Sequence, residues 1–332
     1  MRATALLLVT CLLTACEREA PLESDAEAAS SAAVAALTNS WSTRAPMPLA
    51  LVSHTAGVVP NSSGVQIAYV MGGFSYARSA VQAGTYAYNP NTNSWATRAP
   101  MPAARNRTNG AGTISGKLYV SGGYGTAGKP TNSLFVYNPA NNTWATRAPM
   151  PNITASGVTA VLGGKLYVLY GECWDCAGYE SNIAQSLWRY DPATNQWLRL
   201  KASPRKHAAG VGGVINGKWY VAGGASDRAL DVYDPETNTW AQKAPMPSGQ
   251  RVAGGAVLGQ KLYVVGGNEG LMNTVYAYNP ATNTWATKAP MPTPRGFLAA
   301  VKVVRNGNPV LLALGGIGNS LPAFATNEEY DD

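Results

Sequence analysis

The sequence predicts an all-β protein, and three observations lead to this prediction. The chain of 332 residues contains 35 glycines, 22 prolines, 17 tyrosines and nine tryptophans, while charged residues make up only 13%. Aromatic residues are enriched in strands, and glycine and proline are enriched in turns. A pattern of short strands separated by turn signals also recurs six times along the chain, which favours strands over helices throughout.

The repeat is marked by six tryptophans that stand 43 to 54 residues apart, namely Trp41, Trp95, Trp144, Trp197, Trp240 and Trp285. A period in this range is typical of architectures in which each repeat is one supersecondary unit. Residues 95–102 return unchanged as residues 144–151 and, with Lys for Arg, as residues 285–292. The copies that begin at Trp41 and Trp240 are close variants, and the copy that begins at Trp197 is the divergent one.

The first two predicted strands of each repeat form a hairpin. The first strand consists of small residues, as in residues 109–112 and 208–213. A tight turn such as residues 115–117 follows, and the second strand ends in a glycine doublet that allows backbone conformations closed to other residues. Five repeats carry this doublet, and the third has Tyr170 in place of the first glycine.

The third and fourth predicted strands are joined by one kind of turn. In residues 88–93, Tyr-Asn-Pro-Asn-Thr-Asn, the first Asn caps the turn, Pro fixes φ, and the last Asn tolerates the left-handed conformation that reverses the chain. No such turn precedes Trp41, whereas the last repeat stops at its third strand near Tyr330. We therefore predict that the strand around Trp41 is the outermost strand of the last repeat and pairs with the strand near Tyr330.

The glycine doublet, the Tyr shortly before it and the later Tyr–Trp pair resemble the kelch repeat. The resemblance covers residues 38–332 and implies a six-bladed β-propeller with four antiparallel strands per blade, whose last blade is closed by the N-terminal strand. The small-residue strand would be innermost, where the blades converge on the channel, and Trp and Tyr would fill the wedges between blades. Basic residues three positions after Trp would protect the exposed outer edges from pairing, namely Arg44, Arg98, Arg147, Lys243 and Lys288.

The N-terminus has the features of an export signal. Residues 1–15 begin with a positive charge and contain an apolar stretch too short to span a bilayer. Leu13-Thr14-Ala15-Cys16 resembles the lipobox of bacterial lipoproteins, which implies acylation of Cys16 after cleavage, and a plain secretory peptide cut near Ala15 is the alternative. Residues 16–37 are predicted to form a flexible acidic tether. We expect an extracytoplasmic protein, lipid-anchored in the bacterial cell envelope and facing the periplasm or the cell surface.

Basic residues stand close to the start of the predicted innermost strands, on the connections between blades. Those connections share a face with the loops between second and third strands, and the kelch resemblance implies that ligands bind there. Guanidinium groups suit carboxylates and sulfates because Arg offers a planar fork for two hydrogen bonds. We predict a basic ring at the channel mouth formed by Arg105, Arg107, Arg205, Lys206, His207, Arg251 and Arg295. The alternative is that these residues pair with acids of the same face and join neighbouring blades.

The long loop of the third repeat carries further candidate residues. Trp174 and Tyr179 would stack on a sugar or peptide, or would pack the loop onto its blade. Cys173 and Cys176 are predicted to form a disulfide in an oxidising compartment; metal binding, redox chemistry and free thiols are the alternatives. A zinc site would need two further Cys or His, and the sequence offers only His54 and His207, so neither a metal nor a cofactor is predicted.

The sequence favours a monomeric binding module for a glycan or protein ligand, and the predicted basic ring suits an anionic one. The net charge of +7 is spread along the chain rather than gathered in a stripe, so nucleic acid is not a predicted partner, and membrane contact is expected through the lipid anchor only. Whether the protein is an enzyme stays open. Six-bladed kelch proteins of bacteria include a sialic acid mutarotase, so the resemblance allows an enzyme of that kind, with Glu172, Glu180 or Glu269 as its acid–base residue.

Overall fold

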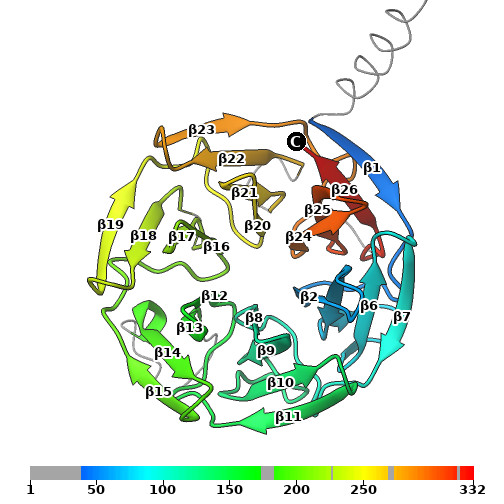
Figure 1. Cartoon of the computed structure of the whole chain (residues 1–332), viewed down its shortest axis with the longest axis horizontal. Coiled ribbons are helices and arrows are strands. Elements are labelled where there is room, and N and C mark those ends of the chain that lie inside the picture. The colour runs from blue at the N-terminus through cyan, green and yellow to red at the C-terminus, as the bar shows by residue number, and fades with distance from the viewer. Residues whose placement is uncertain (1–38, 173–182, 226, 268–272, 320–321) are drawn as a thin grey trace, which may run out of the picture. The chain divides into compact units, whose positions relative to one another are not determined.

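Six four-stranded antiparallel sheets are arranged around a central axis in this computed structural model (Figure 1). The structure describes residues 39–172, 183–225, 227–267, 273–319 and 322–332, and the propeller comprises Asn39–Asp332. The predicted signal peptide, the predicted tether and Cys16 lie outside the described residues, as do Cys173, Trp174, Cys176, Tyr179, Glu180 and Glu269. In the described part no helix is long and apolar enough to cross a membrane.

The blades are numbered here along the chain, and each runs from its innermost to its outermost strand. Blade 1 contains β2 (Thr55–Pro60), β3 (Gln66–Met71), β6 (Thr85–Asn89) and β7 (Ser94–Arg98), with the small hairpin β4 (Phe74–Ser75) and β5 (Ala80–Val81) on its loop. Blade 2 contains β8 (Ala111–Ile114), β9 (Lys117–Ser121), β10 (Leu134–Asn138) and β11 (Thr143–Arg147). Blade 3 contains β12 (Val158–Leu162), β13 (Lys165–Leu169), β14 (Leu187–Asp191) and β15 (Gln196–Arg199), with the short 3-10 turn η1 (Ile183–Gln185) before β14.

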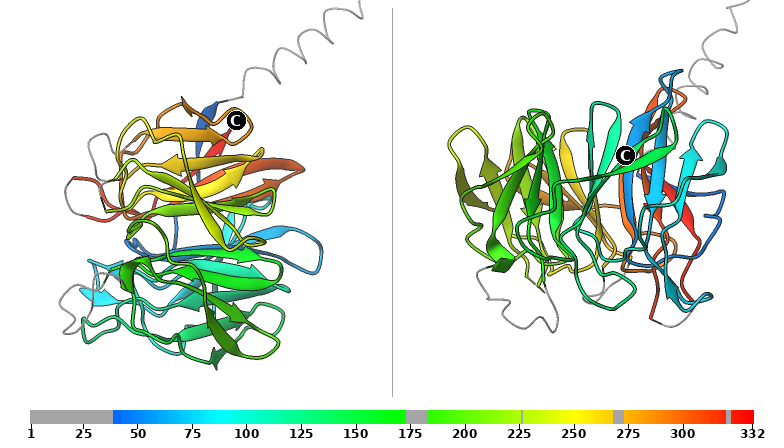
Figure 2. Two further views of the ribbon diagram at one scale, coloured as in Figure 1. Left: turned by 90° about the vertical axis from the view of Figure 1, so that its left-hand side faces the viewer. Right: turned by 90° about the horizontal axis from the view of Figure 1, so that it is seen from below.

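The second half of the propeller repeats this arrangement. Blade 4 contains β16 (Val211–Ile215), β17 (Lys218–Ala222), β18 (Leu230–Asp234) and β19 (Thr239–Lys243). Blade 5 contains β20 (Gly254–Leu258), β21 (Lys261–Val265), β22 (Val275–Asn279) and β23 (Thr284–Thr287). Blade 6 contains β24 (Ala299–Arg305), β25 (Asn308–Leu314), β26 (Asn327–Asp331) and β1 (Ser40–Arg44). In the side views of Figure 2 the strands run from one face of the ring to the other, so every second loop lies on the same face.

The small-residue strands are innermost, as predicted, because neighbouring blades leave no room for larger side chains there. A Cβ atom added at Gly213 of β16 would lie 2.4 Å from the Val257 side chain of β20. A Cβ atom at Gly255 of β20 would lie 2.5 Å from Val211 of β16. Glycine at these positions is therefore required by the close approach of adjacent inner strands.

One polar arrangement joins each outer turn to the preceding blade. The last Asn of the turn has a left-handed φ of 51° to 61° in all six copies, as the turn sequence predicts. In blade 2, Asn142 Oδ1 accepts the Tyr137 hydroxyl at 2.8 Å and the backbone N–H of Ala99 at 2.8 Å. The indole of Trp144 donates to the Ala99 carbonyl at 2.8 Å, so Ala99, which follows blade 1, is held at both backbone groups.

The ring closes in blade 6 with strands from the two ends of the described chain. β1 pairs with β26 in antiparallel register, with Trp41 opposite Tyr330. The Tyr330 hydroxyl donates to Asn39 Oδ1 at 2.7 Å, and the Trp41 indole donates to the Ala289 carbonyl at 2.9 Å. These contacts reproduce the arrangement of the other blades, which confirms the predicted closure of the last blade by the N-terminal strand.

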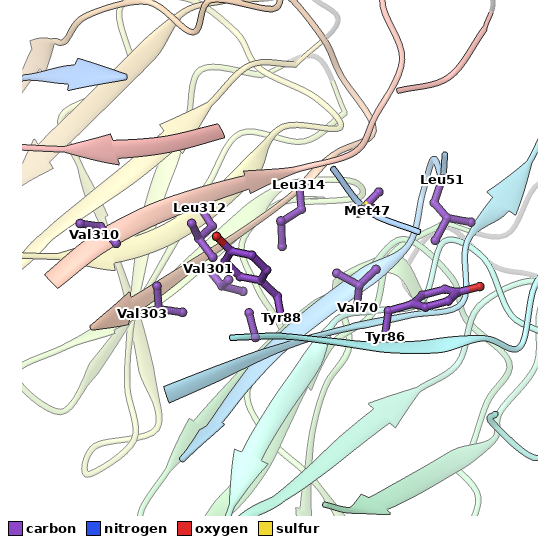
Figure 3. Packing of buried hydrophobic residues seen from close by; sticks show 11 residues of the cluster. Met47, Leu51, Val70, Tyr86, Tyr88, Val301, Val303, Val310, Leu312 and Leu314 are labelled. Carbon is purple, nitrogen blue, oxygen red and sulfur yellow. The ribbon is translucent and has the colours of Figure 1, made fainter. Parts of the chain in front are cut away.

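Apolar side chains fill the wedges between neighbouring blades. Between blades 6 and 1, Val70 and Tyr88 of blade 1 form one buried cluster with Val303 and Leu312 of blade 6 (Figure 3). Met47, on the connection from blade 6 to blade 1, belongs to the same cluster. Burial of such side chains is the main favourable term that holds the blades together.

The basic residues of the outer strands do not all stand free on the edge. Arg98 and Arg147 are exposed, as expected for edge protection. Arg44, however, is an ion-pair partner of Glu329 at 2.5 Å, and Lys288 is a partner of Asp332 at 2.6 Å. The expectation of exposed edge charges is therefore corrected for these two residues, because Glu329 of the closing strand β26 and Asp332 after it lie within ion-pair distance.

Candidate functional site

The innermost strands enclose a cavity of about 480 Å³ on the propeller axis. Small and apolar residues make up most of its lining, and the charged side chains in that lining are Arg107 and Lys302. Among the described residues that line the cavity, none carries a carboxylate. The cavity is therefore cationic, which favours an anionic ligand.

A closed ring of backbone hydrogen bonds surrounds the mouth of this cavity. One residue on the connection into each innermost strand takes part, and the six are Ser53, Arg107, Ser156, Ala209, Val252 and Phe297. Each N–H donates to the carbonyl of the ring residue that belongs to the preceding blade, with distances of 2.7 to 2.9 Å. The bond from Ser53 to Phe297 at 2.9 Å closes the circle. We call these six residues the mouth ring.

Every mouth-ring residue has a left-handed backbone, although none is glycine. Their φ angles lie between 48° and 58°. Such a conformation is an outlier for a β-branched or bulky residue such as Val252 or Phe297, and strained backbone of this kind clusters at functional sites. Because all six N–H groups donate within the ring, none of them is available to an anion, and recognition at the mouth falls to side chains.

Two arginines hold one carboxylate at the mouth. Glu172 Oε2 lies 3.2 Å from Arg251 Nη2, and Glu172 Oε1 lies 3.9 Å from Arg107 Nη1. The Arg107 guanidinium carbon also lies 5.4 Å from the centroid of the Phe297 ring, within the range of a cation–π contact. Glu172 is fixed by an antiparallel bridge to Ala155, in which its N–H donates to the Ala155 carbonyl at 2.9 Å. The structure thus brings the predicted Arg107 and Arg251 together around Glu172.

The other residues of the predicted basic ring occupy different places. Arg105 lies against blade 2, with its guanidinium carbon 5.2 Å from the Phe135 ring centroid and Nε 3.2 Å from the Ser133 hydroxyl. Arg205 is an ion-pair partner of the buried Asp231 at 2.9 Å. Asp231 lies on β18 of blade 4, the blade that Arg205 precedes, so this pair does not join neighbouring blades.

His207 and Arg295 are completely buried and do not reach the mouth, so we no longer place them among the ligand contacts. The two imidazole nitrogens of His207 hydrogen-bond Asp231 at 3.0 Å and the Gly223 carbonyl at 2.8 Å. His207 and Arg295 each stand two residues before a mouth-ring residue, Ala209 and Phe297 respectively. The side chains of His207 and Arg295 pack instead against the blade that each precedes, namely blade 4 and blade 6.

Arg295 is the centre of a buried polar cluster in blade 6. It donates to Glu328 Oε2 at 2.5 Å and to the carbonyls of Ala313 and Thr293 at 2.9 Å each. Burial lowers the pKa of Arg295, and the charge of Glu328 opposes this shift. Burial also lowers the pKa of the nearby His54 to about 4, and the charge of Arg295 acts in the same direction, so His54 is neutral at pH 7.

Sequence analysis missed five of the six mouth-ring residues, namely Ser53, Ser156, Ala209, Val252 and Phe297. The signal that marks the ring is positional, because five of its six residues stand six residues after the Met of a repeat, as Arg107 stands six residues after Met101. The exception is Ala209, which stands six residues after Ser203. Within the ranges that the structure describes, no group of three His, Cys, Asp or Glu side chains is arranged to hold a metal ion.

Comparisons with known proteins agree with this geometry. Residues 30–224 match the model of the KLHDC2/KLHL20/DRC7 Kelch-repeats domain, and residues 253–292 match the Kelch motif. Kelch-like protein 25 of Rattus norvegicus and that of Mus musculus are each 32% identical over 193 residues, which is 55% of this chain. The match spans only 30% of the length of these relatives. The solved "Structure of YjhT" superposes with a TM-score of 0.70 at 20% identity over 86% of this chain and 96% of that one, which shows a shared fold.

Proposed function

This chain belongs to the Kelch-repeat family, and we propose that it is a binding module that holds an anionic group of a protein or glycan ligand at the channel mouth. Kelch propellers typically act as protein-binding modules. One observation carries the proposal for this site: Arg107 and Arg251 meet around a single carboxylate at the entrance of a cavity without acidic lining among its described residues. A ligand carboxylate or sulfate would take the same two guanidinium partners.

The mouth ring makes this site rigid before a ligand arrives. Arg107 and Phe297 belong to the ring, so their backbones are fixed by hydrogen bonds to neighbouring blades. A binding site that is already ordered loses less conformational entropy when the ligand binds. This supports recognition of a small, defined group rather than a diffuse electrostatic attraction.

Glu172 competes with the ligand in this proposal. Its carboxylate occupies Arg107 and Arg251 in the structure, so an anionic ligand must displace it or share its partners. Replacement of Glu172 by Gln leaves a side chain of the same shape without the charge. The variant Glu172→Gln is therefore expected to bind an anionic ligand more tightly than the wild type.

An enzyme like the sialic acid mutarotases is the second candidate, and the position of Glu172 favours it. A carboxyl group beside two arginines at a cavity mouth can act as an acid–base residue while an arginine holds the substrate carboxylate. In that case Glu172→Gln should abolish turnover, whereas a binding module gains affinity. The two functions therefore give different outcomes for one substitution.

The experiment uses the full chain on an array of acidic and neutral glycans and peptides. The tightest ligand is then titrated into wild type, Glu172→Gln and Arg107→Lys, and mutarotation of N-acetylneuraminate is followed in parallel. Arg107→Lys should weaken binding about tenfold because Lys keeps the charge and loses the fork. Arg98→Lys on the exposed outer edge is the matched control. Equal small losses from both arginines would contradict a defined site at the mouth.

The location of the protein is part of the proposal. We propose that Cys16 carries a lipid that anchors the chain in a bacterial cell envelope, with the propeller outside the cytoplasm. The support is the similarity of residues 13–16 to a lipobox. Cys16→Ser should move the protein from the membrane fraction to the soluble fraction, and equal membrane recovery of both proteins would refute the anchor.

A further inference from the structure

The mouth ring is divided into a polar half and an apolar half. In order around the axis, the residues before blades 1, 2 and 3 are Ser53, Arg107 and Ser156. The residues before blades 4, 5 and 6 are Ala209, Val252 and Phe297. Three polar residues thus follow one another, and three apolar residues complete the circle.

The same division continues along the wall of the cavity. Blades 1 to 3 contribute hydroxyl and amide side chains to the lining, including Thr55, Thr108, Asn109, Thr113 and Thr159. Blades 4 to 6 contribute only Gly, Ala, Val, Leu and Phe to the lining, apart from Lys302. We call these two sides the polar wall and the apolar wall.

The backbone N–H groups of the mouth ring do not make the apolar wall more polar. Each mouth-ring N–H already donates to a neighbouring ring carbonyl, so the backbone of Ala209, Val252 and Phe297 offers no donor to a ligand on the apolar wall. A wholly polar ligand would lose water against the Val, Leu and Phe side chains of that wall, which offer no hydrogen bonds. A wholly apolar ligand would remove water from the Arg107 guanidinium without replacing its hydrogen bonds.

We infer that this site selects a ligand in which an anionic group is joined directly to an apolar face. The Arg107 guanidinium lies 5.4 Å from the Phe297 ring, so an anion bound to Arg107 has an apolar surface beside it. The anionic group and the apolar face of the ligand must therefore be close together, as in an arylacetate or an acidic sugar with an apolar ring face. This inference rests on the proposed function and adds the ligand class to it.

The test measures the affinity of the full chain for three small probes by ligand-observed NMR. Phenylacetate carries both features, acetate carries only the anion, and 2-phenylethylamine carries the ring with the opposite charge. We expect phenylacetate to bind at least tenfold more tightly than acetate, and the amine not to compete with it. Burial of a phenyl ring against apolar side chains supplies this difference.

Two variants remove apolar surface from the mouth while they keep the backbone ring. Phe297→Ser and Val252→Ser should each lower the affinity for phenylacetate at least threefold, and should lower it more than the affinity for acetate. Leu198→Ala is the control, because Leu198 is an exposed apolar residue of the outer strand β15. A thermal melt of each variant checks that the propeller is intact, and Val252→Ser serves alone where Phe297→Ser does not fold.

The outcomes separate this inference from the proposed function. Equal affinities for phenylacetate and acetate, both lost in Arg107→Ala, would overturn the apolar selection and leave the anion site in place. An unchanged affinity for phenylacetate in both serine variants would also overturn it. If neither acid binds, or if Arg107→Ala leaves their affinities unchanged, the proposed function and the inference both fail.

Discussion

The backbone N–H of Ser53 donates to the carbonyl of Phe297 at 2.9 Å, and this bond closes the hydrogen-bonded ring at the channel mouth. The two residues stand before the first and the last blade, so the propeller is closed near its axis as well as at its outer edge. At the outer edge the pairing of β1 with β26 performs the same closure. The mouth, where a ligand is proposed to bind, is therefore fixed by the same contacts that complete the fold.

The left-handed backbone of the mouth ring predicts an unusual response to glycine. Ala209 has a φ of 58°, so Ala209→Gly should stabilise the propeller by about 1 kcal/mol, because glycine adopts this conformation without strain. Ala208, its neighbour, is buried and is not left-handed, and Ala208→Gly should destabilise by about 0.5–1 kcal/mol. Urea unfolding of both variants measures the difference. Equal destabilisation by the two substitutions would contradict a strained ring.

Removal of the closing strand should weaken the whole ring. Deletion of residues 1–48 takes away β1, its pairing with β26, and the hydrogen bond of Asn39 to Tyr330. Blade 6 then has an unpaired edge, and the first and last blades are no longer joined by the chain that runs from β1 to β2. Calorimetry should show a lower and broader transition than that of a chain lacking only residues 1–37. An unchanged cooperative transition would argue against this closure.

The buried His54 should make the stability of the propeller depend on pH. Burial lowers its pKa from 6.5 to about 4, so between these pH values the unfolded chain binds a proton that the folded protein does not. Neutral His54 therefore contributes about 3 kcal/mol to the free energy of unfolding above pH 6.5. This contribution is lost as the pH falls from 6.5 towards 4. His54→Gln, which cannot take up this proton, should show a flatter dependence in that window. Parallel curves for the two proteins would disprove the assignment.

Arg295 should matter for stability rather than for binding. Its guanidinium is completely buried against Glu328, and loss of one partner of a buried pair leaves the other charge without compensation. Arg295→Met should therefore destabilise by about 3–5 kcal/mol, and adding Glu328→Gln should recover part of that loss. Arg98→Met on the exposed edge should change stability by less than about 0.5 kcal/mol. A stable Arg295→Met protein with impaired ligand binding would reverse this assignment.

Much of the architecture was determined by local sequence signals. The Asn-Pro turns, the glycine doublets and the small-residue strands each specify a local backbone, and their sixfold repetition predicts six blades of four strands. The absence of a Tyr-Asn-Pro turn before Trp41 likewise predicted the pairing with Tyr330. These features could be predicted because each depends on the conformational preferences of a few neighbouring residues.

Only the tertiary structure decided which basic residues face the channel. Arg105, Arg107, His207 and Arg295 all stand just before innermost strands, yet of these four only Arg107 lines the cavity. The difference arises at the mouth ring, where hydrogen bonds from neighbouring blades hold Arg107 and its five counterparts in a left-handed conformation. No local preference of Arg, Val or Phe favours that conformation, so it exists only once all six blades are assembled around the axis.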